Sequence, residues 1–90
     1  MREVVQTAQF KKDLKRIARS GRYRIEELLD AVDRLSRDER LSVRHRDHAL
    51  TGDLAAYREC HIRLDWLLMY HLTPGQLVLV RTGSHSELFD

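Results

Sequence analysis

Two apolar segments joined by a turn restrict the possible folds of this chain more than any other feature. Residues 65–72 (DWLLMYHL) are almost entirely apolar, and residues 77–82 (LVLVRT) follow after a TPGQ link. A short apolar run of this kind, bounded by turn residues, is typical of a strand inside a sheet. Proline followed by glycine suits the two central positions of a type II turn. The sequence therefore predicts an antiparallel hairpin in which residues 65–72 form a central strand.

The N-terminal half has the residue spacing of two amphipathic helices. Thr7 is the predicted N-cap of the first, and Gly21 suits its C-cap. The second begins at Ile25 and ends near Arg37, and the short link between the helices predicts an antiparallel helical hairpin. The apolar stripes are Phe10, Leu14, Ile17 and Ala18 in the first helix, and Ile25, Leu28, Leu29, Val32 and Leu35 in the second.

The remaining segments complete an α+β pattern. Residues 2–6 and 54–62 are predicted strands, 41–53 a polar loop, and 84–90 a short tail. The predicted order is β-α-α-β-β-β, with a largely antiparallel sheet and the helical hairpin packed on one face. A chain of 90 residues suits a single domain, 1–90.

Charge and apolar content narrow the classes of function. The net charge is only +2, but seven basic residues between 10 and 24 surround one acid, Asp13. They could meet a polyanion or an acidic partner, or form an ordinary solvated helix face. No apolar run approaches the roughly 18 residues of a membrane span, and no signal peptide is evident, so we expect a cytoplasmic protein without membrane contact. Cys60 is the only cysteine and is expected in the core.

Several polar residues are predicted to meet at one end of the sheet. If the hairpin pairs Thr73 with Gln76, Arg81 and His85 reach the end where Asp65 lies, and a tight link brings His61 there too. A slip of one residue would change the face of each side chain but not this convergence. The expected cross-strand pairs are Leu68 with Arg81, Trp66 with Gly83, and Leu64 with His85.

Histidines, a carboxylate and an arginine are the groups needed to cut a phosphodiester bond by attack of a 2′-hydroxyl. Histidine can take the 2′-hydroxyl proton or protonate the leaving 5′-oxygen, and a guanidinium can hold the phosphate. Trp66 and Phe89 could stack a base. Plainer roles are open as well: Trp66 in the core, His71 as a strand residue, and Arg58 and Arg63 as surface charges.

A metal site is the competing chemical interpretation. His45 and His48 lie three positions apart, and other ligands could come from His61, His85, Asp65 and Cys60. No C-x₂-C or H-E-x-x-H spacing is present, and a neighbouring arginine would oppose a divalent cation. We therefore expect no metal and no other cofactor.

Four motifs in the C-terminal half resemble the YafQ-type branch of the RelE/ParE toxin superfamily. They occur in order as residues 47–52 (DHALTG), 57–61 (YRECH), 65–70 (DWLLMY) and 81–89 (RTGSHSELF). The resemblance implies a microbial RNase-type fold and a type II toxin that cuts mRNA in the ribosomal A site, arresting translation. It also implies a cognate antitoxin as partner, with the complex binding its operator DNA.

The resemblance also implies roles for individual residues. His85 would be the leading general acid and Arg81 would hold the scissile phosphate. His48, His61 and Asp65 would share base and orienting work. Phe89 would shape the base pocket, and Trp66 also falls at a motif position. The basic first helix would contact ribosomal RNA or an acidic antitoxin segment through Lys11, Lys12, Lys15 and Arg16.

Two rival functions share features of this pattern. A ParE-like DNA gyrase inhibitor has the same fold but needs no histidine set. A catalytically lapsed module that only binds nucleic acid or an antitoxin would keep the fold without toxicity.

Overall fold

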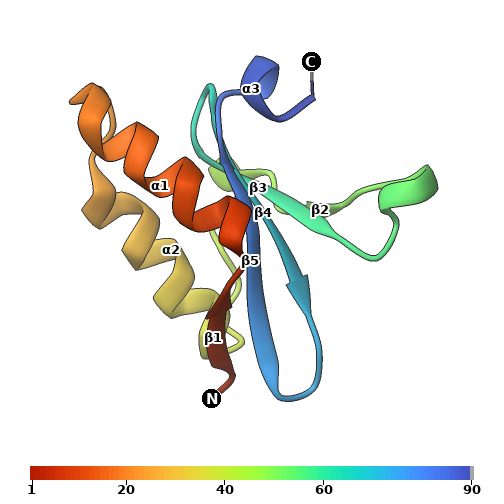
Figure 1. Ribbon diagram of the computed structural model, residues 1–90. Coiled ribbons are helices and arrows are strands. Elements are labelled where there is room, and N and C mark those ends of the chain that lie inside the picture. The colour runs from red at the N-terminus through yellow and green to blue at the C-terminus, as the bar shows by residue number, and fades with distance from the viewer. Residues whose placement is uncertain (90) are drawn as a thin grey trace.

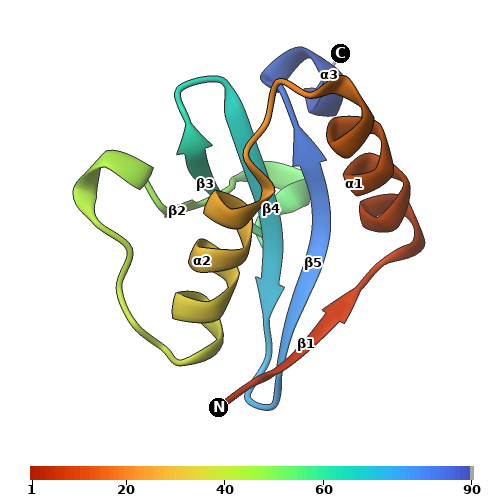
Figure 2. The same ribbon diagram turned by 90° about the vertical axis from the view of Figure 1, so that its left-hand side faces the viewer.

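A five-stranded sheet lies at the centre of the computed structural model, which describes residues 1–89, with two helices over one face (Figures 1 and 2). The strands are β1 (Glu3–Gln6), β2 (His48–Ala49), β3 (Arg58–Arg63), β4 (Trp66–Leu72) and β5 (Gln76–Gly83), and the helices are α1 (Ala8–Ser20), α2 (Ile25–Ser36) and α3 (His85–Phe89). Two short 3₁₀ turns are η1 (Val43–His45) and η2 (Gly52–Leu54). The strand order is β1-β5-β4-β3-β2, which confirms the predicted α+β class.

The two helices form where the sequence predicts them. The Thr7 hydroxyl accepts a hydrogen bond from the Phe10 amide at 3.0 Å, which caps α1. Gly21 ends α1 in the left-handed conformation with φ 70°, which a glycine adopts without strain. Phe10 and Ile17 of α1 and Leu28 of α2 are each 1% exposed against the sheet. Both predicted helices therefore form and pack on the sheet, whereas Ala18 and Leu29 of the predicted apolar stripes are exposed.

The central hairpin is confirmed, but its predicted register holds only near the turn. Leu72 pairs with Leu77, as the pairing of Thr73 with Gln76 requires. Between Met69 and Tyr70 the register shifts by one residue, so Leu68 faces Thr82 instead of Arg81. The extra residue is Val80, whose carbonyl accepts a hydrogen bond from the Thr7 hydroxyl at 2.9 Å. The pairs predicted for Trp66 and Leu64 are wrong for the same reason, because Gly83 faces Leu67.

The link between β4 and β5 is not the predicted type II turn. Gly75 is not among the glycines with positive φ, which that turn requires at this position. The Thr73 side chain closes the link instead, because its hydroxyl accepts from the Gln76 amide at 3.0 Å. The Thr73 amide also donates to the Gln76 carbonyl at 3.0 Å.

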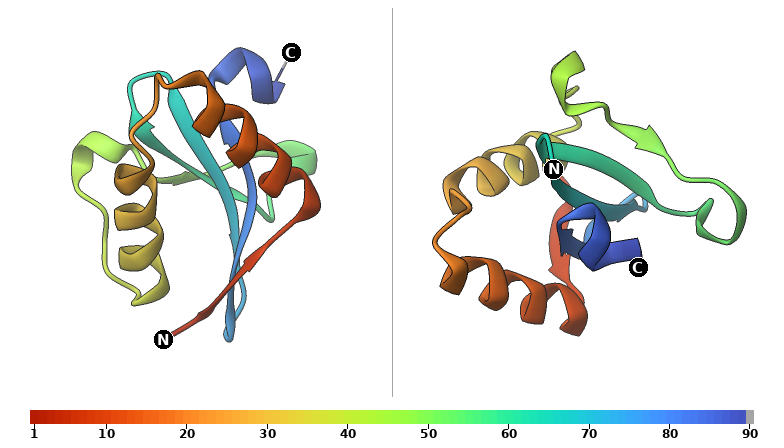
Figure 3. Two further views of the ribbon diagram at one scale, coloured as in Figure 1. Left: turned by 60° about the vertical axis from the view of Figure 1, so that its left-hand side comes forward. Right: turned by 90° about the horizontal axis from the view of Figure 1, so that it is seen from above.

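The structure differs from the predicted arrangement in several other segments. β1 runs parallel to β5, so the sheet is mixed. β2 lies inside the predicted loop 41–53, and the predicted strand 54–62 begins only at Arg58 because η2 precedes it. The predicted tail 84–90 contains α3, although residue 90 lies outside the described part of the chain. Seen from above, the segment with β2 and η2 projects away from α1 (Figure 3).

The main core fills the space between the helices and one face of the sheet. Cys60, Leu68 and Tyr70 are 0% exposed on this face, as expected for Cys60. Burial raises the pKa of the Cys60 thiol, so this thiol stays protonated and unreactive at neutral pH. Across residues 1–89, no helix is long and apolar enough to cross a membrane.

Candidate active site

The face of the sheet opposite the helices carries the candidate catalytic residues. Successive side chains of a strand point to opposite faces, so burial of Cys60 under the helices places Glu59 and His61 on the other face. The strand register aligns one row of residues across four strands, from β2 to β5. This row is His48, Glu59, Met69 and Arg81.

Glu59 joins two of the predicted catalytic histidines. Its Oε1 lies 3.7 Å from Nε2 of His48 and 4.0 Å from Nε2 of His61. Glu59 is 6% exposed, whereas both imidazoles reach solvent. Glu59 was not among the predicted site residues, although its position two residues before His61 in a predicted strand could have identified it.

Both imidazoles are oriented by backbone carbonyls. Nδ1 of His48 lies 2.6 Å from the Arg46 carbonyl, and Nδ1 of His61 lies 3.2 Å from the Leu64 carbonyl. A carbonyl oxygen only accepts hydrogen bonds, so Nδ1 must carry the proton in each ring. In a neutral imidazole this leaves the lone pair on Nε2, the atom that faces Glu59.

Arg81 is anchored by a buried acid of α1. Its Nε and Nη2 donate to the Asp13 carboxylate at 2.9 and 3.0 Å, and Nη1 has no hydrogen-bond partner within residues 1–89. Asp13 is 0% exposed and also accepts from the Thr82 amide at 3.1 Å. Burial opposes the charge of Asp13, but hydrogen bonds from Arg81 and the Thr82 amide outweigh it and hold the pKa below its ordinary value. The hydrogen bonds that Arg81 donates to Asp13 also raise the pKa of Arg81.

His85 and Phe89 form the end of the site on α3. Their rings lie 5.0 Å apart at 42°, and Phe89 is 38% exposed. The His85 amide donates to Asp65 at 3.2 Å, so Asp65 holds the α3 backbone. His85 lies two residues after Gly83, which faces Leu67, and Leu67 in turn faces His61. The register thus brings His61, Asp65, Arg81 and His85 to one end of the sheet, as predicted.

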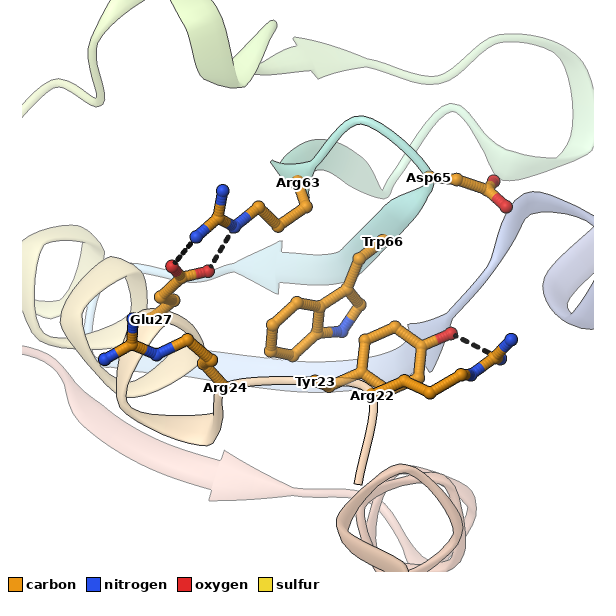
Figure 4. A pocket seen from close by; sticks show the side chains of 7 residues that line it. All are labelled: Arg22, Tyr23, Arg24, Glu27, Arg63, Asp65 and Trp66. Carbon is orange, nitrogen blue, oxygen red and sulfur yellow. Dashed lines mark hydrogen bonds and ion pairs between the residues drawn. The ribbon is translucent and has the colours of Figure 1, made fainter. Parts of the chain in front are cut away.

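Trp66 lies on the helix side of the sheet, away from the histidines. It is 1% exposed, and its Nε1 donates to the Thr82 hydroxyl at 2.9 Å. Its ring packs against Tyr23 at 4.9 Å, whereas the Asp65 side chain points away from it (Figure 4). This position matches the core role that the sequence left open for Trp66 and gives no support to base stacking.

The basic residues of α1 differ in what they contact. Lys11, Lys12 and Lys15 are exposed. Arg16, in contrast, pairs with Asp13 and with Glu87, each at 3.0 Å, and therefore links α1 to α3. Within residues 1–89, no group of three or more His, Cys, Asp or Glu side chains is arranged to hold a metal ion.

Solved structures of bacterial toxins share this fold along their whole length. A copper-bound mutant toxin from Helicobacter pylori superposes with a TM-score of 0.95 at 36% identity, covering 99% of this chain and 100% of that one. YafQ in the Escherichia coli DinJ–YafQ toxin–antitoxin complex gives a TM-score of 0.88 at 32% identity, covering 99% and 98%.

Sequence comparisons agree with the structural ones. The mRNA interferase toxin YafQ of Escherichia coli K12 is 44% identical over 45 residues, which are 50% of this chain and 49% of that protein. This match therefore spans about half the length of the curated relative. The family model described as bacterial toxin of type II toxin–antitoxin system, YafQ, matches residues 2–90. The chain therefore belongs to the YafQ family of bacterial type II toxin–antitoxin toxins.

Proposed function

We propose that this protein is an mRNA interferase, a toxin that cuts mRNA in the ribosomal A site and so inhibits translation. The observation that carries this proposal is the open sheet face with two carbonyl-oriented histidines around Glu59, and with Arg81 in the same cross-strand row. His85 lies at the same end of the sheet. The Escherichia coli relative that is 44% identical over 45 residues bears the name mRNA interferase toxin.

The geometry suits cleavage by an internal nucleophile. Nε2 of His48 or His61 takes the proton of the RNA 2′-hydroxyl, whose oxygen then bonds to phosphorus. The bond from phosphorus to the 5′-oxygen breaks, and His85 protonates that oxygen. The products are a 2′,3′-cyclic phosphate and a 5′-hydroxyl end. Arg81 offsets the negative charge that develops on the phosphoryl oxygens.

Three carboxylates act on these groups without touching the RNA. Glu59 lies beside Nε2 of both imidazoles, where its negative charge faces the proton that either ring takes from the RNA. Asp65 fixes the backbone at His85, and Asp13 fixes the Arg81 guanidinium. Phe89, packed on the His85 ring and partly exposed, is placed to contact a base. Trp66 is assigned to the core instead.

The proposed partners follow from the family and the charges. Because Escherichia coli YafQ was solved with DinJ as a toxin–antitoxin complex, we expect a cognate antitoxin here, with the complex binding operator DNA. Exposed Lys11, Lys12 and Lys15 suit contact with ribosomal RNA, and they suit an acidic antitoxin segment equally. The proposed site of action is the cytoplasm, where mRNA and ribosomes meet.

The test is mRNA cleavage by purified protein with and without programmed ribosomes, comparing wild type with His85→Ala. We expect ribosome-dependent cleavage that falls about 10²- to 10⁴-fold in the variant. His71→Ala is the matched control, because His71 lies near the opposite end of β4 and its Nδ1 bonds the Ala56 carbonyl at 2.7 Å. Absence of cleavage by wild type, with inhibition of gyrase supercoiling, would refute the proposal in favour of a ParE-like toxin.

A further inference from the structure

A basic groove adjoins the proposed active site beside His61. It has a volume of about 340 Å³ and opens to solvent. No acidic side chain among the described residues lines it. The lining residues are Arg44, Arg46, His61, Ile62, Arg63 and Leu64.

Two of the three arginines in this groove form no ion pair with any carboxylate of residues 1–89. Arg63 is bound by Glu27 of α2, with its Nε donating to Oε2 at 2.6 Å (Figure 4). Arg44 and Arg46 are exposed and have no carboxylate within ion-pair distance in the described part of the chain. Asp47, next to Arg46, is already bound by Arg58 at 3.4 Å and by the Tyr70 hydroxyl. The groove therefore presents two guanidinium groups to an external anion.

The segment that carries these two arginines is fixed to β3. Nδ1 of His45 lies 2.6 Å from the His61 carbonyl, and the Arg46 carbonyl accepts a hydrogen bond from Nδ1 of His48. Arg46 has φ 46°, in the left-handed region that a residue with a side chain adopts at a cost. This backbone conformation turns the chain so that His48 faces Glu59 while Arg46 lines the groove.

We propose that this groove binds a backbone phosphate of the RNA strand next to the bond that is cut. The inference rests on the proposed function, because it extends the path of the substrate strand past His61. His61 belongs both to the histidine pair around Glu59 and to the groove, so a strand that lies on the pair continues into the groove. The guanidinium groups of Arg44 and Arg46 bind the phosphate oxygens. Leu64, which is 85% exposed, supplies an apolar wall for the adjoining ribose.

The first measurement is binding of a short single-stranded RNA that carries 2′-O-methyl groups and so cannot be cut. Wild type is compared with Arg44→Gln/Arg46→Gln at several salt concentrations by fluorescence anisotropy. We expect the variant to bind about tenfold more weakly, with a slope of log affinity against log salt that is smaller by about 0.7 for each lost phosphate contact. The control Arg34→Gln/Arg37→Gln removes two charges that are already paired with Asp30 and Asp33 near the end of α2.

The second measurement locates the phosphate. Each phosphate near the cleavage position is replaced in turn by a neutral methylphosphonate. Neutralising one phosphate next to the cleavage position should weaken RNA binding by wild type. The same change should leave RNA binding by Arg44→Gln/Arg46→Gln unchanged, because the variant already lacks this contact. Equal losses for both proteins at every phosphate, or no RNA binding by wild type, would overturn the proposal. Unchanged RNA binding with weakened antitoxin binding would overturn it in favour of an acidic protein segment.

The two proposals fail separately in this design. The binding assays use RNA that cannot be cut, so they test the groove whether or not the protein cleaves. Cleavage of unmodified mRNA by wild type tests the proposed function alone.

Discussion

Asp13 accepts two hydrogen bonds from Arg81, at 2.9 and 3.0 Å, although 68 positions of sequence separate them. The pair lies where β5 extends beyond β1 and would otherwise expose an unpaired edge. There α1 takes the place of a neighbouring strand, because Asp13 also binds the Thr82 amide and Arg16 donates to the Thr82 carbonyl at 3.2 Å. The position of the proposed phosphate-binding guanidinium therefore depends on the docking of α1.

We expect Asp13→Asn to lower both stability and cleavage. An amide has one acceptor oxygen in place of two and carries no charge, so Arg81 loses its bidentate partner. Breaking one member of a buried pair typically costs about 3–5 kcal/mol, which urea denaturation at pH 7 would measure. Cleavage should fall more than the folded fraction explains, because Arg81 is no longer held. Full activity in a folded variant would contradict the positioning role of Asp13.

The stability that Asp13 provides should disappear in acid. The pKa of its carboxyl in the folded protein lies below its ordinary value of 3.8, so the unfolded chain binds a proton first as pH falls. The contribution is therefore complete well above pH 3.8 and is lost as pH falls through the lower pKa of the folded state. Unfolding curves of wild type and Asp13→Asn should converge between about pH 5 and pH 2. A constant difference across this range would contradict the assignment.

Glu59→Gln should separate the electrostatic effect of Glu59 on the histidines from the folding of β3. The variant keeps the size of the side chain but removes the negative charge between His48 and His61. We expect cleavage to fall roughly 10- to 100-fold, less than for loss of a general base or acid, and the pH–rate profile to shift. Thermal unfolding should change little. An unaltered pH–rate profile would show that Glu59 does not act on the histidines.

Local patterns predicted most of the elements. The apolar spacing of Phe10 and Ile17, with Thr7 and Gly21 at the ends, was sufficient for α1 because each signal acts within a few residues. The bulge at Val80 was not predictable in this way. Its free carbonyl accepts a hydrogen bond from the Thr7 hydroxyl, which is 73 positions away in sequence. The parallel pairing of β1 with β5 is a long-range contact of the same kind.

The candidate site was likewise predictable where local patterns decide it and unpredictable where contacts between distant residues decide it. Motif residues at the end of the hairpin were correctly expected to converge, because a hairpin holds its two ends together whatever its register. Of the three supporting carboxylates, Asp65 was predicted, but Asp13 and Glu59 were missed. Only the folded chain brings Asp13 to Arg81, whereas the place of Glu59 two positions before His61 was available from the sequence. Trp66 could not be assigned to a face without the register, because neighbouring strand residues point in opposite directions.

Gly83→Ala should strain the backbone that leads into α3 and disturb the ion pair between Arg16 and Glu87 that links α1 to α3. Gly83 has φ 152°, and a Cβ atom there would lie 2.7 Å from Nη2 of Arg16 and 2.9 Å from Oε1 of Glu87. We expect a loss of about 1–3 kcal/mol and a marked loss of cleavage. Gly75→Ala is the matched control, because its Cβ would meet nothing within 4 Å and its φ is not positive. Equal stability of the two variants in thermal unfolding would contradict the constraint at Gly83.

Trp66→Ala should act through stability, since the ring is a buried part of the core. Truncation of a buried tryptophan typically costs about 3–5 kcal/mol, measurable by urea denaturation. Trp66→Phe should cost far less, because it keeps an aromatic ring beside Tyr23 and loses mainly the hydrogen bond to Thr82, worth about 1 kcal/mol. Thr82 stays satisfied, because its hydroxyl still donates to the Leu67 carbonyl at 2.8 Å. The folded fraction of Trp66→Phe should therefore cleave mRNA almost as well as wild type. A stable Trp66→Phe protein with little cleavage would instead show that the indole contacts the substrate, which would require the helices to move away from this face of the sheet.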